Sequence, residues 1–318
     1  MHTTRNRSRA IPLVLFAIGG ALACTDATGP RLTPDATPPA LARATQSYTL
    51  IGAGDIAGCS SSGDEKTASL ILNVLGTDPK ATVFTAGDNA YENGSTSDYA
   101  NCYDPSWGQV KGATHATLGN HDYGTGTADP AFSYFGPRVG KRGEGWHSID
   151  LGAWHVVFLN SQRSYVSLSA TGPQLTWLKA DLAATTKQCI VAIWHDPLFY
   201  GNQTGGAPGK KNFVKVFWDV LYAAGAEIVI NGNKHDYERF MPQDPNGNPD
   251  PKGIREFIVG TGGRSVSSAP IYLWPTSEVQ GGKTFGVLKL TLGTGTYQWD
   301  FVPVAGGTFT DSGSGTCS

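Results

Sequence analysis

Short apolar runs alternate along the chain with stretches whose apolar residues have helical spacing. The short runs predict strands over residues 48–54, 81–86, 114–118, 146–151, 154–160, 190–194, 227–230, 285–292 and 296–304. The helical spacing predicts helices over residues 67–75, 174–184 and 213–224. Strands and helices in this order indicate an α/β fold, in which we expect two packed mixed β-sheets flanked by helices.

Cap and turn residues mark several boundaries of these elements. Ser62 and Glu65 form the pattern of a capping box just before the helix over 67–75. Gly152 predicts the turn of one hairpin, and the apolar runs within residues 285–304 predict a second hairpin that closes the β-rich end of the chain.

The first residues have the composition of an export signal. Three arginines precede an uncharged apolar run, residues 10–23, that ends at Cys24. The run is shorter than the roughly 20 apolar residues of a membrane-spanning helix, so we interpret residues 1–23 as a signal peptide. Residues 21–24 resemble a bacterial lipobox, and we expect a lipid on Cys24 to anchor the exported protein to a membrane. The alternative is an ordinary signal peptide that leaves a soluble secreted or periplasmic protein.

The rest of the chain divides into a linker and one domain. Residues 24–46 contain the anchor cysteine and a segment rich in Pro, Thr and Ala, which we expect to be disordered. Residues 47–318 have the length of a single α/β domain.

A formal net charge of −2 without a long basic run does not support a specific nucleic-acid partner. A small anionic substrate is compatible with that charge, because a metal site can supply local positive charge.

Apart from Cys24, the cysteines are even in number: Cys59, Cys102, Cys189 and Cys317. Disulfides persist in exported proteins, and four cysteines allow three pairings. We favour Cys59 with Cys102, because both lie in loops that should meet. Cys189 with Cys317 would then attach the tail to a core strand.

Polar residues of types that bind metals or act in catalysis follow the predicted strands in five blocks. The blocks are residues 54–57 (Gly-Asp-Ile-Ala), 87–91 (Gly-Asp-Asn-Ala-Tyr), 119–122 (Gly-Asn-His-Asp), 194–195 (Trp-His) and 232–235 (Gly-Asn-Lys-His). In α/β folds the residues after such strands converge on a shared crevice. Carboxylate, amide and phenol oxygens with imidazoles suit Fe, Mn or Zn, so the blocks predict a metal centre.

These five blocks, in this order, resemble the calcineurin-like metallophosphoesterase superfamily. Tyr91 within Gly-Asp-x-x-Tyr makes the site similar to the purple acid phosphatase branch, whose first block, like this one, lacks a histidine at the position of Ala57. The resemblance covers nearly the whole domain, from Asp55 through residues 235–240 to the run 257–263. It implies an αββα sandwich and a phosphoesterase with two metal ions that acts on small phosphorylated substrates.

For the first metal ion the resemblance implies Asp55, Tyr91 and His235 as ligands, with Asp88 bridging both ions. A bridging carboxylate holds two ions close enough for a hydroxide to form between them and for both to clamp a phosphate. The phenolate of Tyr91 adds negative charge, which favours Fe(III) at this position.

For the second ion, which we expect to be Zn, Mn or Fe, the implied ligands are Asn120, His195 and the residue that matches a family imidazole, here Asn233. His121 would stand beside the leaving oxygen as a hydrogen-bond donor or general acid, so we expect His121 and Asp88 to be catalytic. An amide in place of an imidazole predicts a weakened second site, and Lys234 would repel a cation.

Other residues have structural interpretations. Relatives often carry a second histidine after the one that matches His195, whereas here Asp196 follows, and its carboxylate is a candidate for partial compensation. We expect the run 236–240 to pack the loop after His235, with Arg239 paired locally. Histidines and tryptophans outside the blocks are expected to be structural: His115, His147, His155, Trp146, Trp154, Trp177 and Trp218.

Two functions of different classes follow from these observations. The leading hypothesis is a metal-dependent phosphoesterase, acting on phosphomonoesters or small phosphodiesters by attack of metal-bound hydroxide. The alternative is a protein of the same fold with one metal ion and little activity, which acts as a binding protein. Other metal-dependent hydrolysis is a third possibility.

Overall fold

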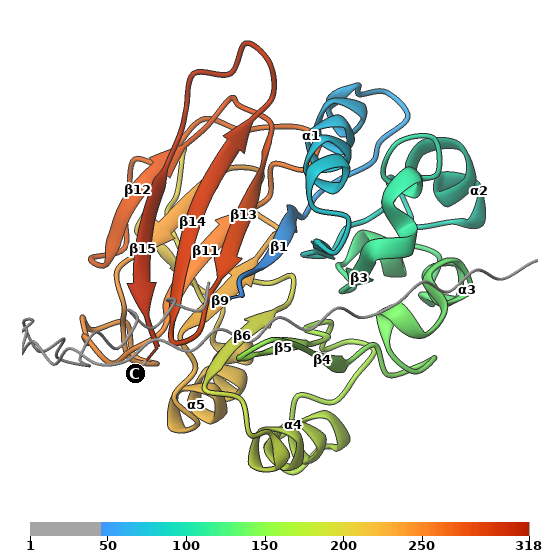
Figure 1. The fold of residues 1–318 in the computed structure, drawn as a ribbon. Helices are drawn as coiled ribbons and strands as arrows, with labels where there is room; N and C mark the ends of the chain where they lie inside the picture. The colour runs from blue at the N-terminus through green and yellow to red at the C-terminus, as the bar shows by residue number, and fades with distance from the viewer. Residues whose placement is uncertain (1–45, 318) are drawn as a thin grey trace, which may run out of the picture. The chain divides into compact units, whose positions relative to one another are not determined.

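The computed structural model describes residues 46–317, whose strands form two mixed β-sheets (Figure 1). The six-stranded sheet has the order β15-β14-β13-β1-β2-β3, with β1 Tyr48–Ala53, β2 Thr82–Thr85, β3 Thr114–Ala116, β13 Gly286–Leu292, β14 Thr296–Pro303 and β15 Ser312–Thr316. The seven-stranded sheet has the order β12-β10-β11-β9-β6-β5-β4, with β4 His147–Leu151, β5 Trp154–Phe158, β6 Cys189–Ile193, β9 Ile228–Asn231, β10 Tyr237–Phe240, β11 Arg255–Val259 and β12 Ser277–Gly281. A small hairpin joins β7 Phe199–Tyr200 to β8 Gly209–Lys210.

Helices flank both sheets, which confirms the predicted fold class. The α-helices are α1 Gly63–Thr77, α2 Thr96–Asp98, α3 Asp129–Phe135, α4 Pro173–Ala184 and α5 Lys215–Ala223. Short turns of 3-10 helix lie at Trp107–Ala113, His121–Tyr123, Gly136–Val139 and Asn212–Val214, and a π-helical turn lies at Tyr99–Tyr103.

The side chains of the central strands alternate between two apolar cores. On β5, Val156 and Phe158 belong to the core shared by the two sheets, whereas Val157 belongs to the core shared with α4 and α5. Successive residues of a strand point to opposite faces, so a strand covered on both sides reads as a continuous apolar run. For this reason the central strands could be recognised from the sequence.

The predicted strands and hairpins agree with the structure to within a few residues. The turn at Gly152 connects β4 to β5, and β13 pairs antiparallel with β14. The predicted capping box was wrong: the Ser62 side chain makes no capping hydrogen bond, and the Gly63 amide donates instead to Oγ of Ser61 at 3.0 Å. The helix α1 begins at Gly63, four residues before the predicted start at Thr67.

Two segments of the C-terminal half differ from the predictions. The run 236–240 is mainly strand β10, which pairs with β11 and β12, and Arg239 forms ion pairs with the distant residues Glu278 and Asp311. The strand β15 was not predicted, because its Ser-Gly-Ser-Gly-Thr sequence carries no apolar pattern.

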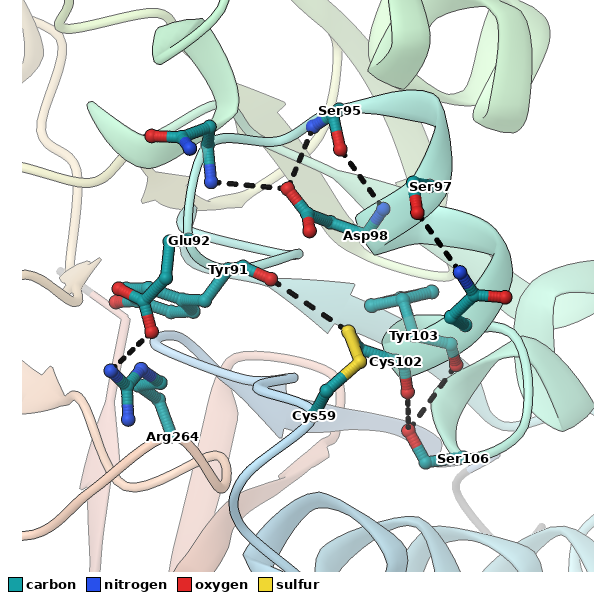
Figure 2. Close-up of a disulfide and its surroundings, with 12 residues drawn as sticks. Cys59, Tyr91, Glu92, Ser95, Ser97, Asp98, Cys102, Tyr103, Ser106 and Arg264 are labelled. Carbon is teal, nitrogen blue, oxygen red and sulfur yellow. Dashed lines mark hydrogen bonds and ion pairs between the residues drawn. A yellow bond between two sulfur atoms is a disulfide. The ribbon is translucent and has the colours of Figure 1, made fainter.

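Two disulfides join the cysteines in the favoured pairing. Cys189 at the start of β6 is bonded to Cys317, just after β15. Cys59 is bonded to Cys102, whose Sγ lies 3.8 Å from the carbonyl oxygen of Tyr91 (Figure 2). This bridge therefore joins the loop that follows Asp55 to the segment next to Tyr91. Disulfides of this kind are compatible with export.

The predicted signal peptide, the predicted lipid anchor at Cys24 and the predicted linker lie outside the described residues, except for Gln46. Within residues 46–317, no helix has the length and apolar character needed to cross a lipid bilayer.

Candidate metal centre

The five sequence blocks meet at one place because each follows a strand at the same end of a sheet. β1, β2 and β3 are parallel neighbours, and so are β6 and β9. The carboxyl ends of parallel strands carry their following residues to a common crevice. The residues brought there, in strand order, are Asp55, Asp88, Tyr91, Asn120, His121, His195, Asn233 and His235.

One half of the centre is built around the hydroxyl of Tyr91. Its oxygen lies 3.0 Å from Oδ1 of Asp55 and 2.9 Å from Oδ2 of Asp88. Nε2 of His235 lies 3.2 Å from Oδ1 of Asp55 and 3.4 Å from the Tyr91 hydroxyl. These four side chains are the ones that the family resemblance implies for the first metal ion, with Asp88 as the bridging ligand.

The other half shares Asp88. Nε2 of His195 lies 3.3 Å from Oδ2 of Asp88 and 3.2 Å from Oδ1 of Asn120. Single ligand atoms of Asp55, Asp88 and His195 all lie within 4.8 Å of one another, and all three residues are buried. Asp88 thus lies between the two halves, as a bridging carboxylate must.

The two inner imidazoles are held by their outer nitrogens. Nδ1 of His195 donates to the carbonyl oxygen of Ala86 at 2.8 Å, and Nδ1 of His235 lies 2.6 Å from Oγ of Ser265. Histidines that bind metals usually have such an outer partner, which fixes the ring and directs Nε2 inward. Both rings therefore present Nε2 to the carboxylates.

The buried carboxylates create a strong demand for positive charge. Burial opposes ionisation of Asp88, but its contact with His195 lowers the pKa of the carboxyl below the ordinary value. Burial also disfavours the charged form of His195, yet Asp88 raises the pKa of this imidazole to about 10. Burial, reinforced by Asp55 and Asp88, raises the pKa of the Tyr91 phenol far above its ordinary value. A bound cation would meet this demand in place of protons.

The backbone at the centre is strained. Asp55, Asp88 and Asn233 have φ angles of 59°, 52° and 67°, in the left-handed region that side chains rarely adopt, and Lys283 is the other described non-glycine residue there. Such conformations cluster at functional sites, where the surrounding fold imposes them. At Gly119 an added Cβ would lie 2.1 Å from Oδ1 of Asp88, so only glycine permits this close approach.

Asn233 differs from an imidazole ligand in its hydrogen bonding. Its Nδ2 lies 3.3 Å from Oδ1 of Asn120 and 3.0 Å from Oδ1 of Asp196. Asp196 also accepts hydrogen bonds from three other side chains: Lys211, Ser161 and Gln162. Both oxygens of Asp196 are thus occupied by donors, which argues against the partial compensation expected from this carboxylate.

Lys234 lies with its ammonium over the ring of Tyr200, 4.6 Å from the ring centroid. A cation above an aromatic face is stabilised by the ring quadrupole. This contact holds the ammonium near Tyr200. The repulsion expected between Lys234 and a bound cation stays a prediction.

His121 lies at the edge of the centre. Its Nδ1 donates to the carbonyl oxygen of Glu92 at 2.5 Å, and its Nε2 lies 4.0 Å from Oδ2 of Asp88. Its ring packs against Tyr91, with the ring centroids 4.3 Å apart, and the side chain is 35% exposed. His121 can therefore reach both the centre and a ligand that enters from solvent.

The histidines assigned structural roles lie outside the centre. Nδ1 and Nε2 of His155 lie 2.8 Å from Asp150 and Asp181, and Nδ1 of His115 lies 3.1 Å from Nε2 of His147. Trp154 and Trp218 are fully buried, whereas Trp146 and Trp177 are partly buried against the core formed with α4 and α5.

Sequence reasoning missed three residues that border the centre: Glu92, Arg264 and Ser265. Arg264 donates its backbone amide to the carbonyl oxygen of Asp55, and its guanidinium lies over the Tyr91 ring. Its one signal in the sequence is its position directly after the run 260–263, Gly-Thr-Gly-Gly, which belongs to the resemblance described above.

Comparisons with known proteins bear on the sequence relationship and the fold of this chain. No family model matches the chain. Purple acid phosphatase 18 of Arabidopsis thaliana is 29% identical over 136 residues, and purple acid phosphatase 21 of the same plant is 31% identical over 137 residues. Each match covers 42% of this chain and 30% of the relative, so the chain matches under a third of the length of these relatives.

Solved structures share the fold. The purple acid phosphatase PPD1 from yellow lupin (Lupinus luteus) seeds superposes with a TM-score of 0.68 and 20% identity, covering 85% of this chain and 54% of the other. GAP50, the anchor in the inner membrane complex of Plasmodium, superposes with a TM-score of 0.66 and 13% identity, covering 86% and 89%. The chain thus shares the fold of the lupin purple acid phosphatase and a stretch of sequence similarity with the Arabidopsis purple acid phosphatases, which together support a relationship to the calcineurin-like metallophosphoesterase superfamily.

Proposed function

We propose that this protein is a metal-dependent phosphoesterase that hydrolyses small phosphorylated substrates at a dinuclear centre. The observation that carries the proposal is the position of Asp88, whose carboxylate contacts Tyr91 on one side and His195 on the other. Asp55, Asp88, Tyr91 and His235 would hold the first ion. Asp88, Asn120 and His195 would hold the second, with Asn233 as a weak further ligand.

The side chains present fit such a centre. Two buried carboxylates, a phenol and two oriented imidazoles form an oxygen-rich and nitrogen-containing set without thiolates, which suits Fe, Zn or Mn. The phenol of Tyr91 holds its proton strongly, because burial and the neighbouring carboxylates oppose its ionisation. A trivalent ion displaces such a proton better than a divalent one, which supports Fe(III) at the first position.

When bound, the two ions would supply Lewis acidity at the phosphate and an activated water. The residues of the chain orient and neutralise the substrate around them. In its protonated form His121 donates a hydrogen bond from Nε2, and then a proton, to the leaving oxygen. The Glu92 carbonyl oxygen engages Nδ1, which keeps Nε2 on the side of the centre.

A second function is favoured by one observation. The amide nitrogen of Asn233 is hydrogen-bonded to Asp196, so its donor group, rather than its oxygen, lies near Asn120. A protein that binds one ion firmly and the second weakly would have low activity and would act as a binding protein. The N-terminal prediction adds a location to both functions: export, with a lipid on Cys24 holding the protein at a membrane.

The experiment that separates the two functions measures metal stoichiometry and hydrolysis of an aryl phosphate on the same purified sample. For the phosphoesterase we expect turnover that rises as the bound metal approaches two equivalents. A sample with two firmly bound ions and no hydrolysis of any phosphate ester would contradict the proposed enzyme. One equivalent without turnover, even in excess Mn or Zn, would support the binding protein.

A further inference from the structure

Arg264 is a cationic side chain whose backbone is attached to the metal centre. Its amide donates to the carbonyl oxygen of Asp55 at 3.0 Å, so Arg264 is attached to the turn that holds this carboxylate. Its guanidinium carbon lies 5.3 Å from the centroid of the Tyr91 ring. Because the hydroxyl of Tyr91 contacts both Asp55 and Asp88, one aromatic ring separates the guanidinium from the carboxylates.

The fold leaves space for the guanidinium at this position. Gly58 faces the Arg264 side chain, and a Cβ on Gly58 would lie 2.6 Å from Cδ of Arg264. Figure 2 shows Arg264 next to Glu92 and Tyr91. In the same view the Cys59–Cys102 disulfide joins the loop after Asp55 to the turn that contacts the Tyr91 carbonyl oxygen. The guanidinium is therefore positioned by its ion pair with Glu92 and by packing against Gly58 and the Tyr91 ring.

The hydrogen-bonding capacity of Arg264 is only partly used. Nη2 donates to the carboxylate of Glu92, a side chain that is 58% exposed, while the Arg264 side chain is 26% exposed. Within residues 46–317, no acceptor is hydrogen-bonded to Nε or Nη1 of Arg264. An ion pair with a solvent-exposed carboxylate contributes little to stability and is readily exchanged for another anion.

We propose that Arg264 binds a terminal oxygen of the substrate phosphate and makes the site selective for phosphate monoesters; this inference rests on the proposed function. The guanidinium is a planar fork of donors that matches phosphate oxygens, and it stays charged at all relevant pH values. A monoester has three terminal oxygens and a charge between about −1.5 and −2 near neutral pH. A diester has two terminal oxygens and a single charge, so an added cation beside the centre stabilises the bound monoester more.

The test uses the metal-loaded full-length protein and two variants that break the same ion pair from opposite ends, Arg264→Gln and Glu92→Gln. Calorimetry measures the affinity of each for inorganic phosphate. We expect Arg264→Gln to weaken binding by about tenfold, the size typical of one charge-assisted hydrogen bond. Glu92→Gln should tighten binding, because it removes the carboxylate that competes for the guanidinium. Thermal unfolding of each variant checks that it is folded.

The two variants distinguish substrate binding from a structural ion pair. A structural pair would be lost equally in both, so equal weakening by Arg264→Gln and Glu92→Gln would overturn the proposal. Phosphate affinity of Arg264→Gln equal to that of the unmodified protein would overturn it as well, and so would a failure of the unmodified protein to bind phosphate.

Selectivity is measured with an aryl phosphate and the corresponding diaryl phosphate. Arg264→Gln should lower kcat/KM for the monoester by about tenfold and for the diester by clearly less. An equal loss for both esters would overturn the selectivity. If the unmodified protein hydrolyses neither ester while Arg264→Gln still weakens phosphate binding, the enzyme proposal fails and the binding role of Arg264 stands. If the unmodified protein hydrolyses both esters and Arg264→Gln changes neither rate, the enzyme proposal stands and the role of Arg264 is wrong.

Discussion

The side-chain amide nitrogen of Asn233 lies 3.0 Å from Oδ1 of Asp196. This carboxylate is buried and also bonded to Lys211 at 2.5 Å, so it acts as a fixed acceptor. Rotating the Asn233 amide to present its oxygen to a cation would break the bond to Asp196 and bring two oxygens together. We therefore expect the proposed second metal site to lack one good ligand.

The replacement Asn233→His should strengthen binding of the second ion. An imidazole would supply the missing nitrogen ligand. Loss of such a ligand should lower metal affinity at least as much as loss of an outer-sphere partner, which typically costs roughly 10–100-fold. We expect the unmodified protein to carry closer to one metal ion than two, and the variant, best combined with Lys234→Asp, to carry closer to two with higher turnover. Elemental analysis and aryl phosphate hydrolysis measure both. Tight binding of two ions by the unmodified protein, with no gain in Asn233→His, would show that this half is complete.

Asp88→Ala should reduce hydrolysis to the level of a protein-free control and lower the metal content. The reason is that Asp88 is the carboxylate that contacts both halves of the centre, through Tyr91 and His195. The matched control is Glu65→Gln, which neutralises an exposed carboxyl on α1 and should leave metal content and turnover unchanged. Normal turnover with two ions in Asp88→Ala would contradict the assignment of the site.

Tyr91→Phe should remove a visible absorption band from the oxidised, iron-loaded protein. A phenolate bound to Fe(III) gives a ligand-to-metal charge-transfer band, and the Tyr91 hydroxyl is the phenol that contacts Asp55 and Asp88. Tyr123→Phe is the control, because the Tyr123 hydroxyl bonds to Asn160 instead, and this variant should keep the band. A colourless protein with stoichiometric iron would exclude a Tyr91 phenolate ligand.

Replacement of His155 should destabilise the protein more in acid than in base. Burial opposes protonation of His155, but its contacts with Asp181 and Asp150 outweigh this and raise the pKa of its imidazole above the ordinary value of about 6.5. A raised folded-state pKa adds stability that is fully present below about pH 6.5 and is lost as the pH rises through the folded-state pKa. We expect His155→Gln to cost on the order of 1 kcal/mol more at about pH 5.5 than at about pH 9, measured as the free energy of unfolding in urea.

His147→Gln supplies a control with the opposite sign. Burial and the neighbouring His115 lower the pKa of the His147 imidazole to about 3 in the folded protein. As the pH falls, His147 is therefore protonated in the unfolded chain before it is protonated in the folded protein, which destabilises the fold. Its replacement should therefore cost less at about pH 5.5 than at about pH 9. The same pH trend in both variants would show that the Asp150–His155–Asp181 contacts do not set the titration of His155.

Local patterns in the sequence were sufficient for the central strands and for the five blocks of the site. Strands such as β5 and β6 are covered on both faces, so nearly every residue must be apolar, and this demand is visible over a few residues. The polar residues that follow them, among them Asp55, Asp88 and His195, are conspicuous for the same reason. The favoured disulfide pairing, one of three that the cysteines allow, also agrees with the structure.

Features that depend on contacts between distant segments were decided by the tertiary structure. The strand β15 has no apolar pattern and exists because it pairs with β14. Arg264 lies beside Tyr91, and Asp196 holds Asn233, because the ends of separate strands meet in one crevice. No spacing along the chain encodes these neighbours, since the direction of each side chain is set by the packing of two sheets, one of which joins strands from the two ends of the described chain while the other uses its middle.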